Sequence, residues 1–95
     1  MIAEYSAKTS QDIFKSTIRN KNFMTPLVLG YFRPSKDHIA ELSQGQGMEG
    51  NDLFGVTVVT KDRSTHQWVH NTAQGKCCRS RSEAMEHIEA LALIV

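Results

Sequence analysis

Residues 53–60 read Leu-Phe-Gly-Val-Thr-Val-Val-Thr, a run rich in β-branched side chains. Such side chains are typical of strands. The polar segment 61–64 follows, and residues 65–72 read Thr-His-Gln-Trp-Val-His-Asn-Thr, which we expect to form the second strand of an antiparallel hairpin. A second turn at 73–76 leads into a short strand at 77–79. The C-terminal half of the chain therefore predicts a three-stranded meander.

The meander is followed by the clearest helix signal in the chain. Ser80 and Glu83 form a Ser-x-x-Glu capping box, which is typical of a helix N-terminus. The apolar side chains that follow are spaced by three and four residues, namely Ala84, Met85, Ile88, Leu91, Ala92 and Val95. This spacing predicts a helix to the end of the chain, with the apolar stripe facing the core.

The N-terminal part predicts a strand, a helix and a second strand. Residues 2–7 alternate as a strand does, and Thr9 or Ser10 is the expected N-cap of a helix at about 10–20. Residues 27–32 form an apolar run between two prolines. The length of this run predicts a strand buried on both faces.

Two weaker signals lie between that strand and the meander. Pro34 and Ser35 predict the start of a short helix, with Ile39 and Leu42 as its only apolar anchors. Residues 44–52 contain three glycines, and we expect a flexible loop there.

Together these segments predict a single small α+β domain over residues 1–95. The expected order is β-α-β-(α)-β-β-β-α, with an antiparallel sheet and the helices packed on one face of it. A chain of 95 residues has room for one core. No apolar run is long enough to cross a bilayer, and residues 1–8 do not resemble a signal peptide. We therefore expect a cytoplasmic protein without membrane contact.

The chain offers few residues for catalysis or metal binding. Cys77 and Cys78 are adjacent, and neighbours on a strand point to opposite faces, so we expect both to be reduced, one buried and one exposed. An intermolecular disulfide is the alternative. His66 and His70 would lie about 13 Å apart on one strand, too far to share a metal ion. A Cys/His nucleophile pair across the meander stays open as a third hypothesis, but we expect no enzyme, no cofactor and no metal.

The basic residues and the single tryptophan are the candidate binding residues. They are Lys61, Arg63, Trp68, Lys76, Arg79 and Arg81. Residues 53–82 carry five basic side chains against one acid, although the net charge of the whole chain is only +1. Arg79 and Arg81 flank the N-terminus of the last helix, where free N–H groups and the helix dipole favour an anion. The tryptophan either fills the core or lies exposed as a recognition anchor.

The segment from Phe54 to Leu91 resembles the double-stranded-RNA-binding domain, a family with three antiparallel strands followed by a helix. The similarity is carried by Gly75, Ser80, Ala84, Ala90 and Leu91. The lysine cluster of the family at the helix start is reduced to Arg81, and Met85 stands where a further lysine is expected. This resemblance implies direct binding of nucleic acid, which is the alternative function.

In type, the whole chain is similar to small phage and mobile-element proteins, among them the anti-CRISPR proteins. The shared features are fewer than 100 residues, one domain, no enzyme signature and uneven charge. This resemblance implies a non-enzymatic inhibitor that blocks a bacterial nucleic-acid-handling complex, such as a CRISPR-Cas complex, by steric and electrostatic occupation. The expected partner is a protein or ribonucleoprotein complex in the host cytoplasm, and a homodimer stays open.

Overall fold

The computed structural model describes residues 4–18, 27–46 and 50–94. Within them the elements are α1 (Ala7–Thr17), β1 (Leu27–Ser35), β2 (His38–Gln46), β3 (Asp52–Lys61), β4 (Trp68–His70), the 3₁₀ turn η1 (Thr72–Gln74), β5 (Lys76–Cys78) and α2 (Arg81–Ile94). These strands form one sheet in which all pairs are antiparallel. The predicted small α+β domain is therefore confirmed.

The strand β3 lies inside the sheet and includes the β-branched run at 53–60. One of its edges pairs with β2 from Thr60 opposite His38 to Asp52 opposite Gln46. The other edge of β2 pairs with β1, where the register shifts between residues 28 and 30. Because β2 has partners on both sides, its backbone groups are hydrogen-bonded within the sheet.

The last step of the predicted meander is wrong. The strands β4 and β5 both pair with β3, β4 with residues 59–61 and β5 with residues 54–56. Between them the side chain of Asn71 caps η1 by accepting a hydrogen bond of 3.2 Å from the backbone N–H of Gln74. The chain therefore continues along the same edge of β3 instead of turning back, and the predicted strand at 65–72 is reduced to β4.

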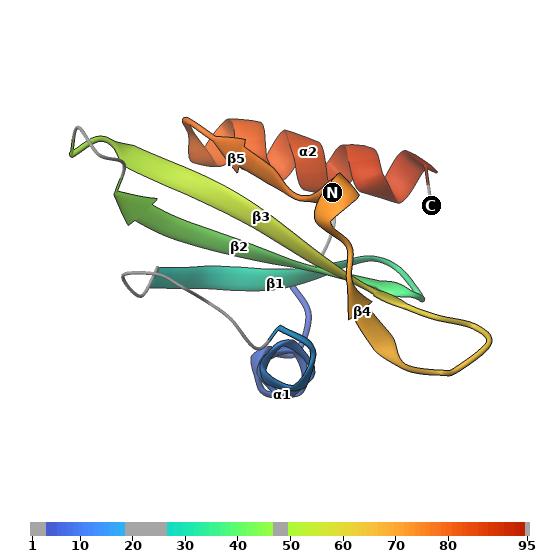
Figure 1. The fold of residues 1–95 in the computed structure, drawn as a ribbon. Helices are drawn as coiled ribbons and strands as arrows, with labels where there is room; N and C mark the ends of the chain where they lie inside the picture. Colours follow the sequence, from blue (N-terminus) through green and yellow to red (C-terminus); the bar gives the residue numbers. More distant parts are fainter. Residues whose placement is uncertain (1–3, 19–26, 47–49, 95) are drawn as a thin grey trace.

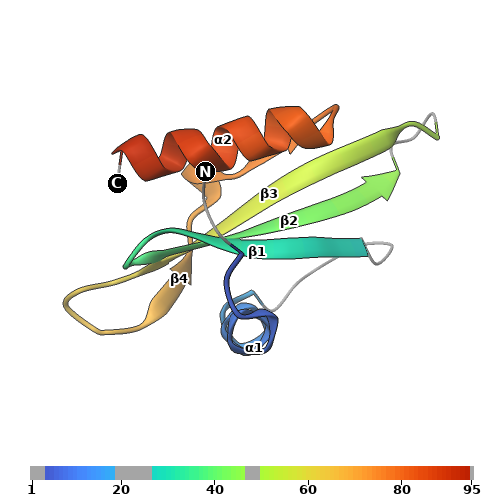
Figure 2. The same ribbon diagram turned by 180° about the vertical axis from the view of Figure 1, so that it is seen from behind.

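The two helices cover opposite faces of the sheet, with α2 on one side and α1 on the other (Figures 1 and 2). The expectation that both pack on one face is wrong. Its physical reason is visible in the strands, because residues 31–32, 39–40 and 58–59 are pairs of adjacent buried apolar residues. Neighbours on a strand point to opposite faces, so each pair presents apolar surface to both sides and both sides need a cover.

Each face has its own hydrophobic cluster. Under α2 the buried members are Phe32, Ala40, Leu42, Val56, Val58, Cys78, Ala84, Ile88 and Leu91. Under α1 they are Phe14, Tyr31, Ile39 and Val59. The buried positions of α2 belong to the predicted stripe, so the orientation of this helix was correctly predicted.

The short helix predicted after Pro34 is a strand. The residues Ile39 and Leu42 have helical spacing, but in β2 they point to opposite faces and belong to different clusters. Pairing with β1 and β3 buries both faces of this segment, and such tertiary pairing overrides a weak local preference. The polar residues between β1 and β2 form a hairpin turn instead of a helix start.

The first predicted strand is also wrong for the residues described. Glu4 makes an isolated bridge with Phe32, and α1 begins at Ala7. The side chain of Ser6 is the N-cap, accepting a hydrogen bond of 3.4 Å from the N–H of Thr9, so the helix starts earlier than predicted. Residues 2–3 of that strand and residues 19–20 of the predicted helix lie outside the described residues.

The glycine-rich segment 44–52 is largely taken up by strands. Residues 44–46 complete β2, and residue 52 opens β3. Gly50 has a φ of +80°, a conformation that glycine adopts at little cost. The connection between the two strands is thus shorter than the predicted loop, and its residues 47–49 lie outside the described part.

Candidate functional site

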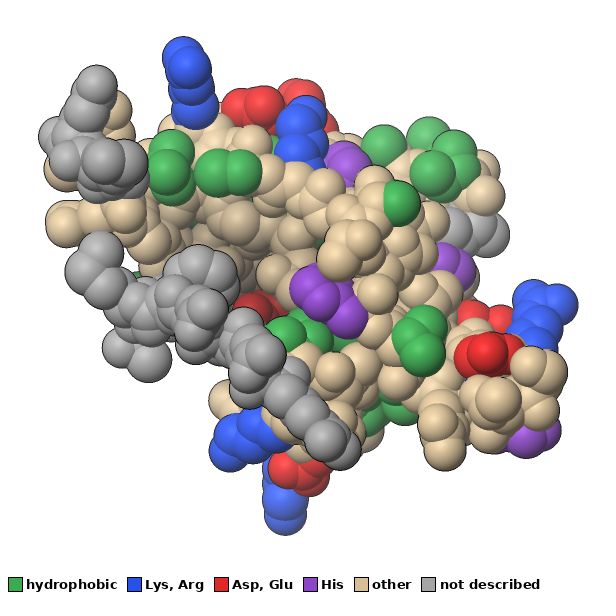
Figure 3. Space-filling view, viewed as in Figure 1, with side chains coloured by type: hydrophobic (Ala, Val, Ile, Leu, Met, Phe, Trp, Pro, Cys, Tyr) green, Lys and Arg blue, Asp and Glu red, His purple; other side chains and the backbone are tan. Residues whose placement is uncertain are grey.

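The structure divides the predicted binding residues between two places along β3. Lys61 is the last residue of β3, and Trp68 lies opposite it on β4. Lys76 lies opposite Val56, towards the other end of the strand. In Figure 3 the Lys and Arg side chains of the visible face are likewise spread over separate places. The six residues therefore do not form one patch.

The group formed by Lys76, Arg79 and Arg81 surrounds the start of α2. There the Glu83 carboxylate accepts a hydrogen bond of 3.2 Å from the N–H of Arg79 and lies 3.6 Å from the Nζ of Lys76. The N–H of Glu83 in turn donates to the Oγ of Ser80 at 3.1 Å, as the capping box predicts. An external anion at this helix end would therefore compete with a carboxylate of the chain itself.

Trp68 occupies a position between its two predicted alternatives. It is half-buried, and it packs against the cluster under α1. Tyr5, Ile13 and Ile18 are the other partly buried residues that pack against the same cluster. The indole therefore contributes to the packing beneath α1. Only the exposed part of its surface is left for contact with a partner.

Lys61 and Arg63, in contrast, meet other charged residues at the end of the sheet where two connections lie side by side. We call this surface the hairpin tip. It consists of Lys36, Asp37, Lys61, Arg63 and His66, which line a hollow of about 500 Å³. Its residues come from the β1–β2 turn and from the end of β3 with the connection that follows, and a backbone hydrogen bond of 2.8 Å from the N–H of Lys61 to the carbonyl of Asp37 joins the two.

The β1–β2 turn is held by a serine at its base. The Oγ of Ser35 lies 2.6 Å from the Nδ1 of His38 and accepts a hydrogen bond of 3.3 Å from the N–H of Asp37. Burial lowers the pKa of His38, and the negative charge of Asp37 opposes that shift. Burial therefore favours the neutral form of the imidazole. The contacts of Ser35 with His38 and Asp37 fix the conformation of the turn.

The β3–β4 connection is held by Asp62. Its carboxylate accepts hydrogen bonds of 2.8 Å from both the N–H and the hydroxyl of Ser64, an Asx-type turn. These bonds lower the pKa of Asp62. Its carbonyl accepts the N–H of His66, which has a φ of 58°, at 2.8 Å. The imidazole of His66 is thereby carried on an ordered turn next to the basic residues.

The charge of the hairpin tip is positive. Three cationic side chains line the hollow, against the single carboxylate of Asp37. The side chains of Lys36, Arg63 and His66 are exposed, whereas Asp37 is mostly shielded. Figure 3 shows basic, acidic and histidine side chains gathered at the end of the molecule where the β3–β4 connection lies. An anionic group is the ligand that this arrangement favours.

Sequence reasoning missed Lys36, Asp37 and His66 as members of this site. Because residues 34–42 were assigned to a helix, nothing placed Lys36 near the turn at 61–64. His66 was assigned to a strand face with His70, but it lies in the turn before β4. The polar run Ser35-Lys36-Asp37, bounded by Pro34, is a turn signal that could have located the hairpin.

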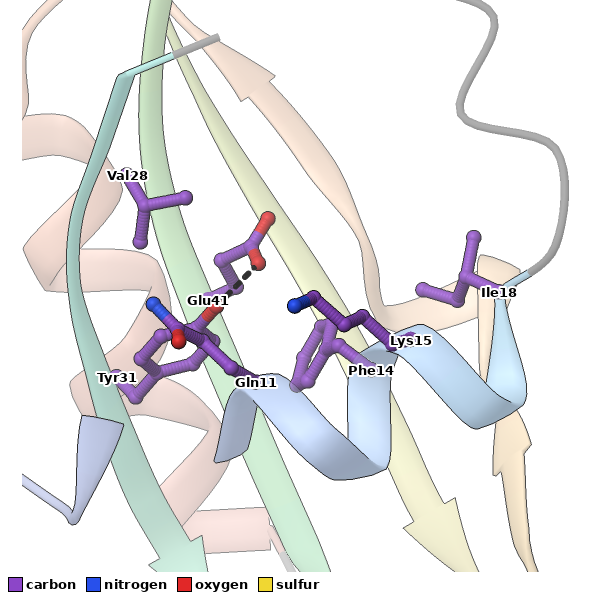
Figure 4. Close-up of a pocket in the computed structure, with 7 residues that line it drawn as sticks. All are labelled: Gln11, Phe14, Lys15, Ile18, Val28, Tyr31 and Glu41. Carbon is purple, nitrogen blue, oxygen red and sulfur yellow. Dashed lines mark hydrogen bonds between the residues drawn. The ribbon is translucent and has the colours of Figure 1, made fainter. Parts of the chain in front are cut away.

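A second hollow lies between α1 and the sheet, and we call it the α1 groove. Its volume is about 580 Å³, and it is lined by Gln11, Phe14, Lys15, Ile18, Val28, Tyr31 and Glu41. Figure 4 shows Tyr31 and Glu41 side by side on neighbouring strands, with the side chains of α1 beside them. The lining of the groove is thus mixed: apolar side chains alternate with the polar side chains of Gln11, Lys15 and Glu41.

The hydroxyl of Tyr31 donates a hydrogen bond of 2.9 Å to the Oε2 of Glu41, and both residues are buried. Burial raises the pKa of Tyr31 well above its ordinary value, and the negative charge and hydrogen bond of Glu41 add to the shift. The phenol therefore keeps its proton and cannot serve as a base near neutral pH. The ring of Phe14 packs on Tyr31 with the centroids 5.4 Å apart, so this pair also anchors α1.

His70 and Cys77 do not approach each other across the sheet. His70 lies opposite Val59 and Cys77 lies opposite Gly55, four residues apart on β3, which corresponds to about 13 Å. One cysteine is exposed and one is buried, as predicted: Cys77 is the exposed one, Cys78 is the buried one, and both are free thiols. Burial raises the pKa of Cys78, which keeps it protonated and unreactive.

Within residues 4–18, 27–46 and 50–94, no three His, Cys, Asp or Glu side chains are close enough to hold a metal ion. In the same residues no helix has the length and apolar character needed to cross a membrane. Comparison of the chain with family models, with curated proteins and with solved structures gives no match. The function must therefore be argued from the geometry of the chain itself.

Proposed function

We propose that this protein is a non-enzymatic binding protein that contacts the phosphate groups of a nucleic acid through its hairpin tip. The observation that carries the proposal is the hollow between the two connections, where Lys36, Lys61 and Arg63 gather with His66 around a single acid. Sequence alone pointed to two of these cations, and the fold adds the third. Basic side chains that meet in one hollow favour phosphate over neutral ligands.

The backbone of the hairpin tip supports this proposal. The two connections are joined by the bond between Lys61 and Asp37, and the β3–β4 connection is closed by Asp62. A cationic site on ordered turns loses less conformational entropy on binding than one on a loose loop. Phosphate contacts of this kind position a protein on nucleic acid without reading its sequence.

Inhibition of a bacterial nucleic-acid-handling complex is the specific biological form of the proposal. A small domain that holds the phosphates of a nucleic acid inside such a complex would exclude other proteins from that surface by steric and electrostatic occupation. The partner is then a nucleoprotein, with direct contact to its nucleic acid. Co-purification of the protein with a nucleoprotein complex from a bacterial lysate, lost after nuclease treatment, is the outcome expected from this form.

The direct test is binding of a fluorescent DNA or RNA oligonucleotide, followed by anisotropy at increasing salt. The affinity of the wild type should fall steeply with salt, because each phosphate contact releases counterions. The variant Lys61→Glu, Arg63→Glu should lose about tenfold or more in affinity at low salt.

Two further variants give the controls. Lys8→Glu, at an exposed position of α1, is matched with the single tip variant Arg63→Glu, so the pair compares the same charge change inside and outside the hairpin tip. Lys76→Glu, Arg79→Glu, Arg81→Glu tests the second basic group, at the start of α2. Equal losses for Lys8→Glu and Arg63→Glu, or no binding at low salt, would contradict the proposal.

A further inference from the structure

Arg63 and Asp37 form an ion pair that uses only part of the guanidinium. The Nε of Arg63 lies 3.1 Å from the Oδ2 of Asp37 and donates a hydrogen bond to it. The Arg63 side chain is 90% exposed, and within the described part of the chain its two Nη atoms make no hydrogen bond. The edge of the guanidinium that carries the two Nη atoms is thus left for a ligand.

Asp37, in contrast, is well fixed. Its side chain is only 22% exposed, its N–H donates to Ser35, and its carbonyl accepts the N–H of Lys61. The main chain of Asp37 is therefore part of the junction between the two connections, and the carboxylate extends from this fixed point. A guanidinium held at Nε by such a carboxylate loses much of its rotational freedom before any ligand arrives.

We propose that Asp37 is a positioning residue, which holds Arg63 so that Nη1 and Nη2 can donate together to two oxygens of one phosphate in the hollow. This inference rests on the proposed function and deepens it, because it names the phosphate group as the ligand and Arg63 as the bidentate donor. Paired donation of this kind matches the planar guanidinium to a phosphate, whereas an ammonium group offers no such fork. The ammonium groups of Lys36 and Lys61 then contribute charge around the same phosphate.

The same ion pair has a simpler reading, in which Asp37 only cancels part of the positive charge. The two readings predict opposite signs when the negative charge is removed. As a counter-charge, Asp37 weakens binding, so Asp37→Asn should tighten it. As a positioning residue, Asp37 strengthens binding, so Asp37→Asn should weaken it in spite of the more favourable net charge.

The experiment is a double-mutant cycle between Asp37→Asn and Arg63→Lys, with binding of the fluorescent oligonucleotide as the measurement. We expect Asp37→Asn alone to weaken binding about threefold, within the range of exposed ion pairs. In the Arg63→Lys background, which has no guanidinium to hold, the same change should leave affinity unchanged or improve it. Amide spectra and unfolding curves of each variant show that the fold is kept.

Each result decides between the readings. Tighter or unchanged binding by Asp37→Asn would overturn the positioning role while leaving the hairpin tip as the binding site, provided that Lys61→Glu, Arg63→Glu still loses affinity. If neither the wild type nor any variant binds the oligonucleotide, the proposed function fails first, and the positioning role with it. A weakening of equal size in both backgrounds would also overturn it, since Asp37 would then act without Arg63.

Discussion

The hydroxyl of Tyr31 and the carboxylate of Glu41 are joined by a 2.9 Å hydrogen bond between β1 and β2, beneath α1. Tyr31 is 3% exposed and Glu41 is 2% exposed. A buried carboxylate needs hydrogen-bond donors, and this hydroxyl is one that the sheet itself supplies. Loss of this hydrogen bond should therefore lower the stability of the fold.

Tyr31→Phe removes that donor while keeping the ring that packs on Phe14. We expect it to lower the free energy of unfolding by about 1–3 kcal/mol, because a buried charged acceptor loses a partner. Tyr5→Phe is the matched control, since its half-buried hydroxyl only accepts a hydrogen bond of 3.1 Å from Arg33. Urea unfolding of both variants measures the difference, and a smaller loss for Tyr31→Phe than for Tyr5→Phe would contradict the prediction.

The raised pKa of Tyr31 predicts a loss of stability at alkaline pH. Above about pH 10 the unfolded phenol ionises while the folded one keeps its proton, so the unfolded state binds fewer protons. The unfolding free energy of the wild type should then fall with pH, by up to about 1.4 kcal/mol per pH unit from this group. Tyr31→Phe should remove that part of the slope, because lysines titrate equally in both proteins. Parallel stability–pH curves would refute the assignment.

Two leucines near the end of α2 provide a test of its orientation. Leu91 is 2% exposed and belongs to the core, whereas Leu93 is 88% exposed. Leu91→Ala should cost about 2–5 kcal/mol of unfolding free energy through lost burial and the cavity that it leaves. Leu93→Ala makes the same chemical change in the same helix and should stay within about 0.5 kcal/mol of the wild type. Thermal or urea unfolding of the pair checks the difference, and similar losses would mean that α2 is rotated.

The capping box of α2 is testable with two serines. Ser80→Ala removes the oxygen that accepts the N–H of Glu83, and we expect a loss of about 1 kcal/mol in unfolding free energy. Ser82→Ala, two residues later on the exposed side of the helix, should be neutral or slightly stabilising because alanine favours helices. Chemical unfolding of both variants is the measurement. An Ser80→Ala protein as stable as the wild type would exclude the cap.

The two thiols should differ sharply in reactivity. Cys77 is exposed, whereas Cys78 is buried and burial raises its pKa. A thiol reagent should therefore label one cysteine of the folded protein quickly and the second only on unfolding. Cys77→Ser should abolish the fast phase and Cys78→Ser should preserve it. Fast labelling of Cys77→Ser would show that Cys78 is accessible.

Elements with a strong local pattern could be predicted from the sequence. The β-branched run of β3, the capping box at Ser80 and the apolar stripe of α2 each depend on neighbours a few residues apart, and each is present in the structure. That one of the two adjacent cysteines is buried and the other exposed followed in the same way from the alternation of a strand, and the structure shows that Cys78 is the buried one. Periodicity and capping are local, which is why the sequence alone determined them.

The candidate site depended on contacts that no local pattern contains. Of its five residues, Lys61 and Arg63 were predicted, but Lys36 and Asp37 were assigned to a helix. Their position followed only once β2 paired with β3 and brought the β1–β2 turn to the end of that strand. The cationic hollow is therefore a consequence of strand pairing.

The sequence by itself determined that the β3 segment is a strand, that the α2 segment is a helix, and that the chain forms one small α+β domain. Only the tertiary structure decided that β2 is a strand, that β4 and β5 share one edge, and that the helices lie on opposite faces. The physical reason is that local hydrogen bonds and side-chain spacing act over a few residues. Strand partners and faces are instead chosen by the burial of apolar surface between residues far apart in the chain.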